Sequence, residues 1–151
     1  MNQLDLLAQL ATLIEQTPLF THAPFAKEAE LHNALDARDS DPFDATWMAH
    51  YTALQPLEVT HPLQPEERAL ISRIRERAFK AAFATSSSAD LAGYISDDFD
   101  LLARALCLDY ESPWLSALLH SYVQGTFPTG DLLSHQSSLS ATLQQCANRE
   151  P

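Results

Sequence analysis

Glycine is scarce in this chain, and that scarcity constrains the fold more than any other feature. Among 151 residues there are only three glycines, while leucine and alanine are frequent and nine prolines lie mostly at the edges of apolar runs. Tight hairpins depend on glycine, whereas leucine and alanine are strong helix formers and proline is tolerated at helix starts. We therefore predict an all-α fold, a compact single domain of six to eight helices over residues 1–151.

Apolar spacing and capping residues predict where the helices lie. Asp41 before Pro42, and Ser112 before Pro113, are typical helix starts, and Gly125 has the position of a C-terminal cap. Ser96 is expected to cap another helix, after a short turn that Gly93 closes. The expected helices are 2–16, 24–37, 42 to about 54, 65–84, 97–108, 113–124 and 131–146.

A proline-rich segment divides these helices into two halves. Residues 55–65 (QPLEVTHPLQP) contain three prolines and show little periodicity, so we expect a connector there. It would join an N-terminal helical half, about 2–54, to a C-terminal helical half, about 66–147. In the N-terminal half, Phe43, Trp47, Tyr51 and Leu54 would share one aromatic-rich face of their helix.

Charge and targeting signals narrow the classes of partner and the compartment. Twenty acidic and nine basic residues give a formal net charge of −11, which repels nucleic acid and anionic membranes and attracts a basic protein. The first residues, MNQLDLLAQLATLIEQT, lack a basic n-region, and no run reaches the length of a membrane span. Cys107 and Cys146 lie in apolar helical patterns and are expected to be buried thiols. These features favour a cytoplasmic protein.

No motif for catalysis or for ligand binding is complete. DSDPFD (39–44) begins like a calcium loop, but Asp44 and His50 occupy the sixth and twelfth positions, where glycine and a bidentate acid are needed. His32 and Asp36 have metal-compatible spacing, with Glu28 or His50 as further ligands, although a solvated helix face explains them better. There is no G-x-S-x-G, P-loop or G-x-G-x-x-G. We expect no enzyme activity, no cofactor and no metal.

The stretch YISDDFDLLARALCLDYESPW (94–114) holds five carboxylates and has two interpretations. In the first, Asp97, Asp98 and Asp100 follow a capping Ser96 and stabilise the first helical turn, and Asp100 also pairs with Arg104. In the second, the acids project outward because Phe99, Leu102, Ala103 and Leu106 form the core side. They would then belong to a protein-binding face. Its predicted residues are Asp97, Asp98, Asp100, Asp109, Tyr110, Glu111 and Trp114.

Basic residues gather in the predicted helix 65–84. Arg73, Arg77 and Lys80 share one face, and with so acidic a chain we expect them to pair with acids of neighbouring helices. Glu76 and Lys80 are already spaced as a helix-surface pair.

YISDDFDLLARAL (94–106) and DYESPWLSALLHSYVQGTFP (109–128) together resemble small cytoplasmic bacterial immunity proteins. These are the antitoxic partners of polymorphic or contact-delivered toxins. The similarity lies in a helix opened by acids, a short acidic link, and a Pro-Trp helix that ends before Gly-x-Phe-Pro. It covers about a quarter of the chain. The resemblance implies inhibition by occlusion of the toxin's active site or substrate groove, often with acidic residues against a basic groove.

The leading hypothesis is a non-enzymatic, acidic binding protein that neutralises a basic protein partner. The resemblance makes that partner a cognate toxin, such as a nuclease. Two alternatives stay open: a small helical adaptor or regulator, including a nucleic-acid mimic built from carboxylates, and a hydrolase with an unrecognised site. The sequence does not indicate an oligomeric state.

Overall fold

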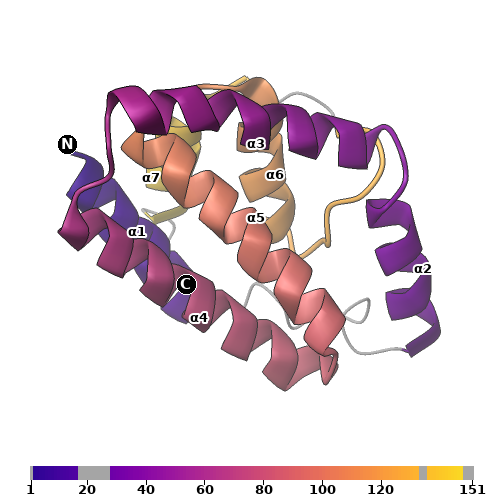
Figure 1. Cartoon of the computed structure of the whole chain (residues 1–151). Coiled ribbons are helices and arrows are strands. Elements are labelled where there is room, and N and C mark those ends of the chain that lie inside the picture. Colours follow the sequence, from indigo (N-terminus) through magenta and orange to yellow (C-terminus); the bar gives the residue numbers. More distant parts are fainter. Residues whose placement is uncertain (1, 17–27, 133–135, 148–151) are drawn as a thin grey trace.

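Seven helices make up the regular structure of the computed structural model, which describes residues 2–16, 28–132 and 136–147 (Figure 1). They are α1 (Gln3–Gln16), α2 (Glu28–Arg38), α3 (Phe43–Thr60), α4 (Pro65–Ser86), α5 (Ala89–Cys107), α6 (Pro113–Val123) and α7 (Leu139–Ala147). The described ranges contain no strand, so the predicted all-α class is confirmed. Within these ranges no helix is both long enough and apolar enough to span a bilayer.

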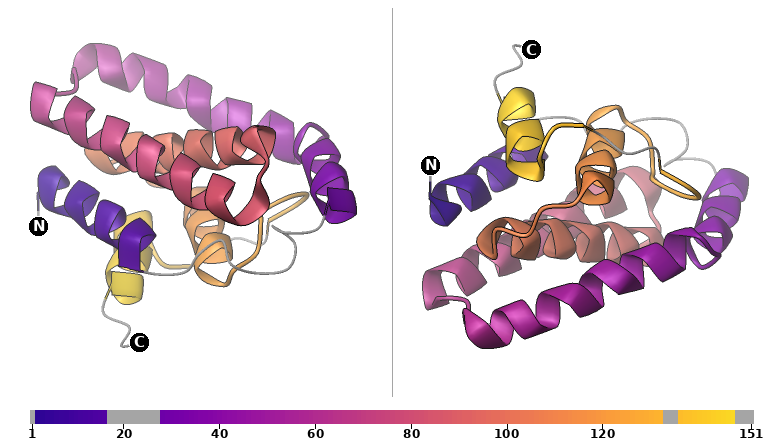
Figure 2. Two further views of the ribbon diagram at one scale, coloured as in Figure 1. Left: turned by 90° about the horizontal axis from the view of Figure 1, so that it is seen from below. Right: turned by 90° about the horizontal axis from the view of Figure 1, so that it is seen from above.

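The helices form three layers around α5 (Figure 2). The central layer is α5 with α4 packed along it, α3 covers one side, and α1, α6 and α7 cover the other. α2 lies at the end of the layers, beside the start of α3 (Figure 1). α5 is central because most of its surface is apolar, and Leu91, Ile95, Phe99 and Leu102 are fully buried. All seven helices contribute side chains to one apolar core.

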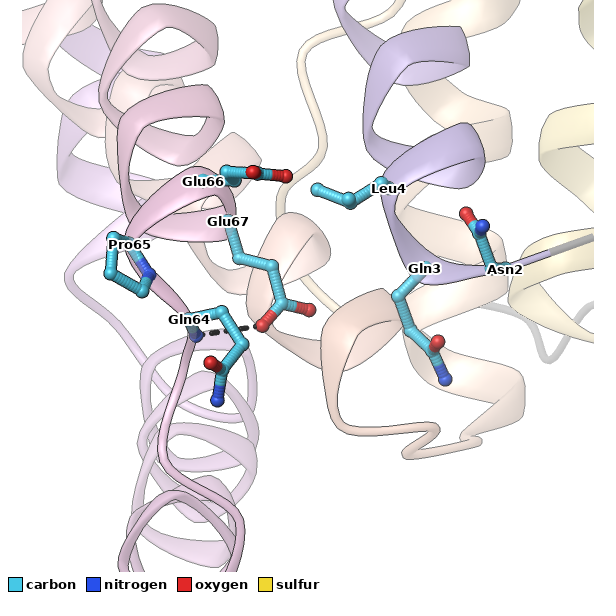
Figure 3. A pocket seen from close by; sticks show the side chains of 7 residues that line it. All are labelled: Asn2, Gln3, Leu4, Gln64, Pro65, Glu66 and Glu67. Carbon is cyan, nitrogen blue, oxygen red and sulfur yellow. Dashed lines mark hydrogen bonds between the residues drawn. The ribbon is translucent and has the colours of Figure 1, made fainter.

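Local signals position several helix starts as predicted. Pro65 opens α4, and Gln64 and Glu67 form a capping box in which the Gln64 amide donates to Glu67 Oε1 at 2.8 Å (Figure 3). At α6 the Ser112 hydroxyl accepts from the Trp114 amide at 3.2 Å. α6 is followed by Gly125, whose φ of 79° is the left-handed conformation of a C-terminal cap.

The start of α3 lies one residue later than predicted. Pro42 precedes the first helical residue instead of occupying it, yet Asp41 Oδ1 still accepts from the Ala45 amide at 3.2 Å. Asp41 therefore lies one position before the N-cap, and its side chain still satisfies an amide of the first turn.

The predicted connector 55–65 is wrong over most of its length. α3 continues through Pro56 to Thr60, so the link to α4 is only 61–64. Proline costs a helix one backbone hydrogen bond, but tertiary contacts on either side offset that loss. Leu54 is buried, and Glu58 forms an ion pair with Arg104 of α5.

The predicted helix 97–108 begins eight residues too late. α5 starts at Ala89, after Ser88, whose hydroxyl accepts from the Leu91 amide at 3.1 Å. Gly93 and Ser96 are interior positions, and the Ser96 hydroxyl donates to the Arg75 carbonyl at 3.1 Å. A glycine costs a helix about 1 kcal/mol, which the burial of Leu91 outweighs.

The remaining predictions concern the two chain ends and the thiols. α7 starts at Leu139, so the predicted helical residues 131, 132 and 136–138 are not part of it, and the predicted start of the helix 24–37 lies outside the described residues. Cys146 is buried as predicted, whereas Cys107 is only partly buried.

Candidate functional site

The structure divides the predicted acidic face among three places. Asp97, Asp98 and Asp100 lie in the middle of α5, not in its first turn, so they cap nothing. Neighbouring helical positions point about 100° apart. Asp97 accordingly is half-exposed, with 49% of its side chain accessible, while Asp98 is fully buried and Asp100 nearly so.

Asp98 is the centre of a buried polar cluster, which corrects its predicted outward position. Its Oδ1 accepts from Arg38 Nη2 at 2.6 Å and from Trp47 Nε1 at 2.9 Å, and its Oδ2 accepts from the Tyr122 hydroxyl at 2.5 Å. Burial is tolerated because a guanidinium and two further donors satisfy the carboxylate. The four residues come from α2, α3, α5 and α6, so this cluster holds the layers together.

Charge and aromatic packing reinforce the cluster. Burial by itself lowers the pKa of Arg38, but attraction to Asp98 and the hydrogen bond between them raise it above its ordinary value overall. The guanidinium also lies 4.3 Å from the ring centroid of Phe43 and 4.9 Å from that of Phe127. Burial, followed by the charge of Asp98, raises the pKa of Tyr122 well above 10. Arg38 and Tyr122 are therefore locked in the forms that bind Asp98.

Asp97 and Asp100 line a groove of about 470 Å³ between α3 and the α4–α5 layer, here called the α3 groove. It is lined by Trp47, Met48, Tyr51, Leu54, Gln55, Glu58, Arg75, Asp97, Asp100 and Arg104. A smaller hollow of about 120 Å³ continues it toward Asp39, Asp44 and Tyr94. The two share Trp47, Met48 and Asp97, so they form one depression along α3.

A ladder of ion pairs crosses the floor of the α3 groove. Arg75 Nη2 lies 2.8 Å from Asp97 Oδ1, and Arg75 Nη1 lies 3.6 Å from Asp100 Oδ1. Arg104 Nε donates to Asp100 Oδ2 at 3.0 Å, which confirms the predicted pair, and Arg104 also pairs with Glu58. Burial raises the pKa of Asp97, Arg75 lowers it, and the neighbouring carboxylates of Asp98 and Asp100 raise it further.

The α3 side of the groove is apolar and partly open. The rings of Trp47 and Tyr51 stack with centroids 5.5 Å apart, and Tyr51 is 39% exposed. Met48 beside them is 45% exposed. The aromatic-rich face predicted for this helix is therefore buried at Phe43 and Leu54 and open between them. Met48 was missed at the level of sequence, and a methionine between Trp47 and Tyr51 was the available signal.

Three of the four remaining predicted site residues, Tyr110, Glu111 and Trp114, contact other helices. Glu111 Oε2 accepts from the Leu139 amide at 3.0 Å, at the start of α7. The Tyr110 hydroxyl bonds to His50 Nδ1 at 2.9 Å, and the Trp114 ring stacks on His50 at 5.2 Å. Asp109 is exposed, with φ of 53°, and lines a separate hollow beside α1 and α7. These four residues do not share the surface of Asp97.

His50, Ser112 and Tyr110 are close enough to invite a hydrolase interpretation. His50 Nε2 lies 3.4 Å from Ser112 Oγ, a long separation for activating a hydroxyl. Ser112 is buried and already caps α6, and the other nitrogen of His50 faces a phenol instead of a carboxylate. Burial also lowers the pKa of His50. The three residues form a packing cluster.

Two further places are candidates for ligand binding. His32 and Asp36 are 3.6 Å apart, both side chains are largely exposed, and no group of three potential metal ligands occurs in the described part of the chain. A hollow of about 440 Å³ lies between the starts of α1 and α4 (Figure 3). Two of its polar side chains serve as caps: Asn2 Oδ1 accepts from the Asp5 amide, and Glu67 accepts from the Gln64 amide. Among the described residues, neither place brings together the groups of a metal or ligand site.

Comparison with known proteins gives one family. The family model described as immunity protein PIM1 matches residues 9–129, from the middle of α1 to beyond α6. That range contains every residue that lines the α3 groove. No curated protein matches the chain.

Proposed function

The chain belongs to the immunity protein PIM1 family, and we propose on that premise that it is a non-enzymatic protein that binds and neutralises a cognate toxin. We further propose that the toxin is basic and docks on the α3 groove. The observation that carries this choice of surface is the exposed pair Met48 and Tyr51, which borders carboxylates. Aromatic residues and methionine are enriched at the centres of protein interfaces.

Negative charge beside the groove supports a basic partner. Asp39 and Asp44 line its smaller hollow, and within the described residues neither has a cationic partner. Asp39 instead accepts from the Tyr94 hydroxyl at 2.5 Å, a bond that raises the pKa of Tyr94 to about 12. Unpaired surface carboxylates speed association with a basic protein and disfavour nucleic acid and anionic membranes.

A nuclease fits this chemistry best among toxins. Enzymes that bind nucleic acid present basic grooves to the phosphate backbone, and an acidic inhibitor competes for those cations. Mimicry of nucleic acid by carboxylates then describes how the protein inhibits. Two partly or fully buried thiols, Cys107 and Cys146, suit a reducing cytoplasm, where a toxin of this class finds its substrate.

Neutralisation by binding is stoichiometric, and that property tests the non-enzymatic part of the proposal. The cognate toxin and this protein are mixed at increasing ratios, and residual toxin activity is measured. Inhibition should be complete at a fixed molar ratio near one to one. Loss of toxin activity at a small fraction of that ratio, growing with time, would indicate that the protein acts as a catalyst.

The docking surface is tested by Tyr51→Ala and Met48→Ala. Each removes exposed apolar area from the groove, and each should weaken toxin binding by roughly thirtyfold in Kd, the equivalent of about 2 kcal/mol for a central interface residue. Phe83→Ala on α4 is the matched control, because Phe83 is 45% exposed and does not line the groove. Circular dichroism checks the fold of each variant. If Phe83→Ala impairs binding and the groove variants do not, the toxin docks elsewhere.

The contribution of surface charge to association with the toxin is tested by neutralising one carboxylate beside the groove and one elsewhere. Asp44→Asn should lower the association rate at low salt, with the difference shrinking as salt screens the charges. Asp109→Asn is the matched control, since Asp109 is exposed but lies in a different hollow. A greater fall in the association rate for Asp109→Asn would indicate that the toxin docks at the link between α5 and α6.

A further inference from the structure

One oxygen on the groove floor lacks a hydrogen bond. Asp100 is 7% exposed, and its Oδ1 has no hydrogen-bond partner among the described residues. A buried acceptor without a donor is costly, and it needs an explanation. The ion pair with Arg75 Nη1, at 3.6 Å, is too long for a hydrogen bond. Because Oδ1 is also closed to solvent, a small movement of Arg75 is the direct way to satisfy it.

Arg75 is held away from Asp100 by Asp97. Its Nη2 donates to Asp97 Oδ1 at 2.8 Å, so one guanidinium serves two carboxylates and satisfies one of them. The side chain of Arg75 is 43% exposed, which leaves it room to move. Any cation that took over Asp97 would release Arg75 toward Asp100.

The floor of the α3 groove carries one more negative than positive charge. Four carboxylates, on Glu58, Asp97, Asp98 and Asp100, are linked by ion pairs to only three guanidiniums, on Arg38, Arg75 and Arg104. The buried members already have their cations within the fold. Asp97 is the most accessible of the four carboxylates, so the missing positive charge can be supplied there from outside.

The surroundings of Asp97 select the kind of cation. Trp47 and Met48 line both parts of the depression together with Asp97, so a cation that reaches this carboxylate also packs against an indole and a thioether. A guanidinium is planar and weakly hydrated and stacks on aromatic groups, whereas an ammonium keeps its water. Arginine therefore fits this site better than lysine.

We infer that one arginine side chain of the toxin enters the α3 groove and pairs with Asp97, and that Arg75 then moves onto Asp100 Oδ1. The identity of the partner as a toxin rests on the proposed function, whereas the arginine-binding site on this chain does not. An arginine amide can be tested on the chain alone.

The test uses N-acetyl-arginine amide as the probe and the ¹⁵N-labelled chain as the receptor. The probe is titrated while the indole N–H of Trp47, which donates to Asp98, and the Nε–H of Arg75 are followed by NMR. Both signals should shift with one saturation curve. N-acetyl-citrulline amide, which has the same shape without the charge, should bind roughly tenfold more weakly, and N-acetyl-lysine amide should also bind more weakly.

Three variants make the test specific. Asp97→Asn should weaken binding of the arginine probe about tenfold, because a charged pair becomes a neutral one. Arg75→Met should strengthen binding, because Arg75 competes with the probe for Asp97. Asp36→Asn, at an exposed carboxylate on α2, should change nothing.

Several results would overturn the inference: equal binding of arginine and citrulline probes, equal binding of lysine, unchanged binding in Asp97→Asn, or no shift up to the solubility limit. Its failure is separable from that of the proposed function. If the probe fails but Tyr51→Ala still weakens toxin binding, the docking surface stands without the arginine. If the probe binds as described but groove variants still neutralise the toxin, the arginine site stands and the docking surface is wrong.

Discussion

Asp97 and Asp98 are adjacent and chemically identical, and replacing each by alanine should have very different effects on stability. Asp98→Ala removes the acceptor for Arg38, Trp47 and Tyr122 at once. Asp97→Ala removes one half-exposed pair with Arg75, which can then turn to Asp100. The comparison holds residue type and sequence position nearly constant and varies only the surroundings.

The magnitudes follow from burial. The side chain of Arg38 is 4% exposed, so Asp98→Ala leaves a buried charge without its partner, which costs about 3–5 kcal/mol. Phenol and indole donors lose their acceptor too, which places the total near the upper end of that range. A half-exposed ion pair contributes about 1 kcal/mol or less, and that bounds the cost of Asp97→Ala. Against a total stability of about 5–15 kcal/mol, Asp98→Ala removes a large share.

The assay is thermal unfolding followed by tryptophan fluorescence, with circular dichroism as a second probe. The melting temperature should fall by roughly 10 °C in Asp98→Ala and by only a few degrees in Asp97→Ala. A double variant, Arg38→Met with Asp98→Leu, should recover part of the loss, because it removes both buried charges together. If Asp98→Ala costs no more than Asp97→Ala, the buried cluster does not hold the helices together and the reasoning fails.

Three further predictions concern α5, a thiol and a phenol. Gly93 lies inside α5, and a Cβ added there would meet open space. Gly93→Ala should therefore raise the free energy of unfolding, measured in urea, by about 1 kcal/mol. A decrease would instead support the turn that the sequence predicted there. Burial, then Glu67, raises the pKa of Cys107 from 9.0 to about 12. Its alkylation by iodoacetamide at pH 8 should be roughly a hundredfold slower than in the unfolded chain, and comparable rates would contradict the burial. Because the pKa of Tyr122 is raised in the fold, the unfolded chain loses that proton first, and the free energy of unfolding should fall as pH rises above about 10. Tyr122→Phe should show a shallower fall, and equal slopes would rule out this cause.

Helices with strong local signals could be predicted closely from the sequence. α4 and α6 each begin with proline after a capping residue, and Gly125 follows α6 as expected. In both cases the residues that decide the boundary are neighbours in the chain. Local chemistry is then sufficient, because the cap satisfies amides only a few residues away.

The start of α5 could not be predicted in this way. Ser88 and Ser96 are both serines with an acid close behind them, so each satisfies the local rule for a helix start. The choice depends on Leu91 and Ile95, which are fully buried against other helices. A glycine between the two serines made the later start look better, although burial outweighs its cost.

The candidate site depended on the same start. Asp97, Asp98 and Asp100 are interior positions of α5, so the helix sets the direction in which each side chain points. The residues that they meet come from α2, α3, α4 and α6. The pair Asp100–Arg104 was predictable because four residues separate its members. The pair Arg38–Asp98 joins residues sixty positions apart, and no local pattern indicates it.

Net charge alone would misplace the proposed docking surface. Among the described residues, five lysines and arginines form ion pairs with acids, and all five lie on α4 or α5 or pair with an acid there: Arg38, Arg75, Arg77, Lys80 and Arg104. The acids of that region are therefore largely neutralised within the fold. Asp39 and Asp44 have no cationic partner among the described residues, and both line the hollow that Met48 also lines. Long-range attraction depends on uncompensated charge, and short-range affinity depends on exposed apolar area. The two coincide at the α3 groove, to which the stretch of five carboxylates contributes Asp97 and Asp100 but not Asp98, Asp109 or Glu111. The start of α3 is therefore more informative about docking than that stretch as a whole.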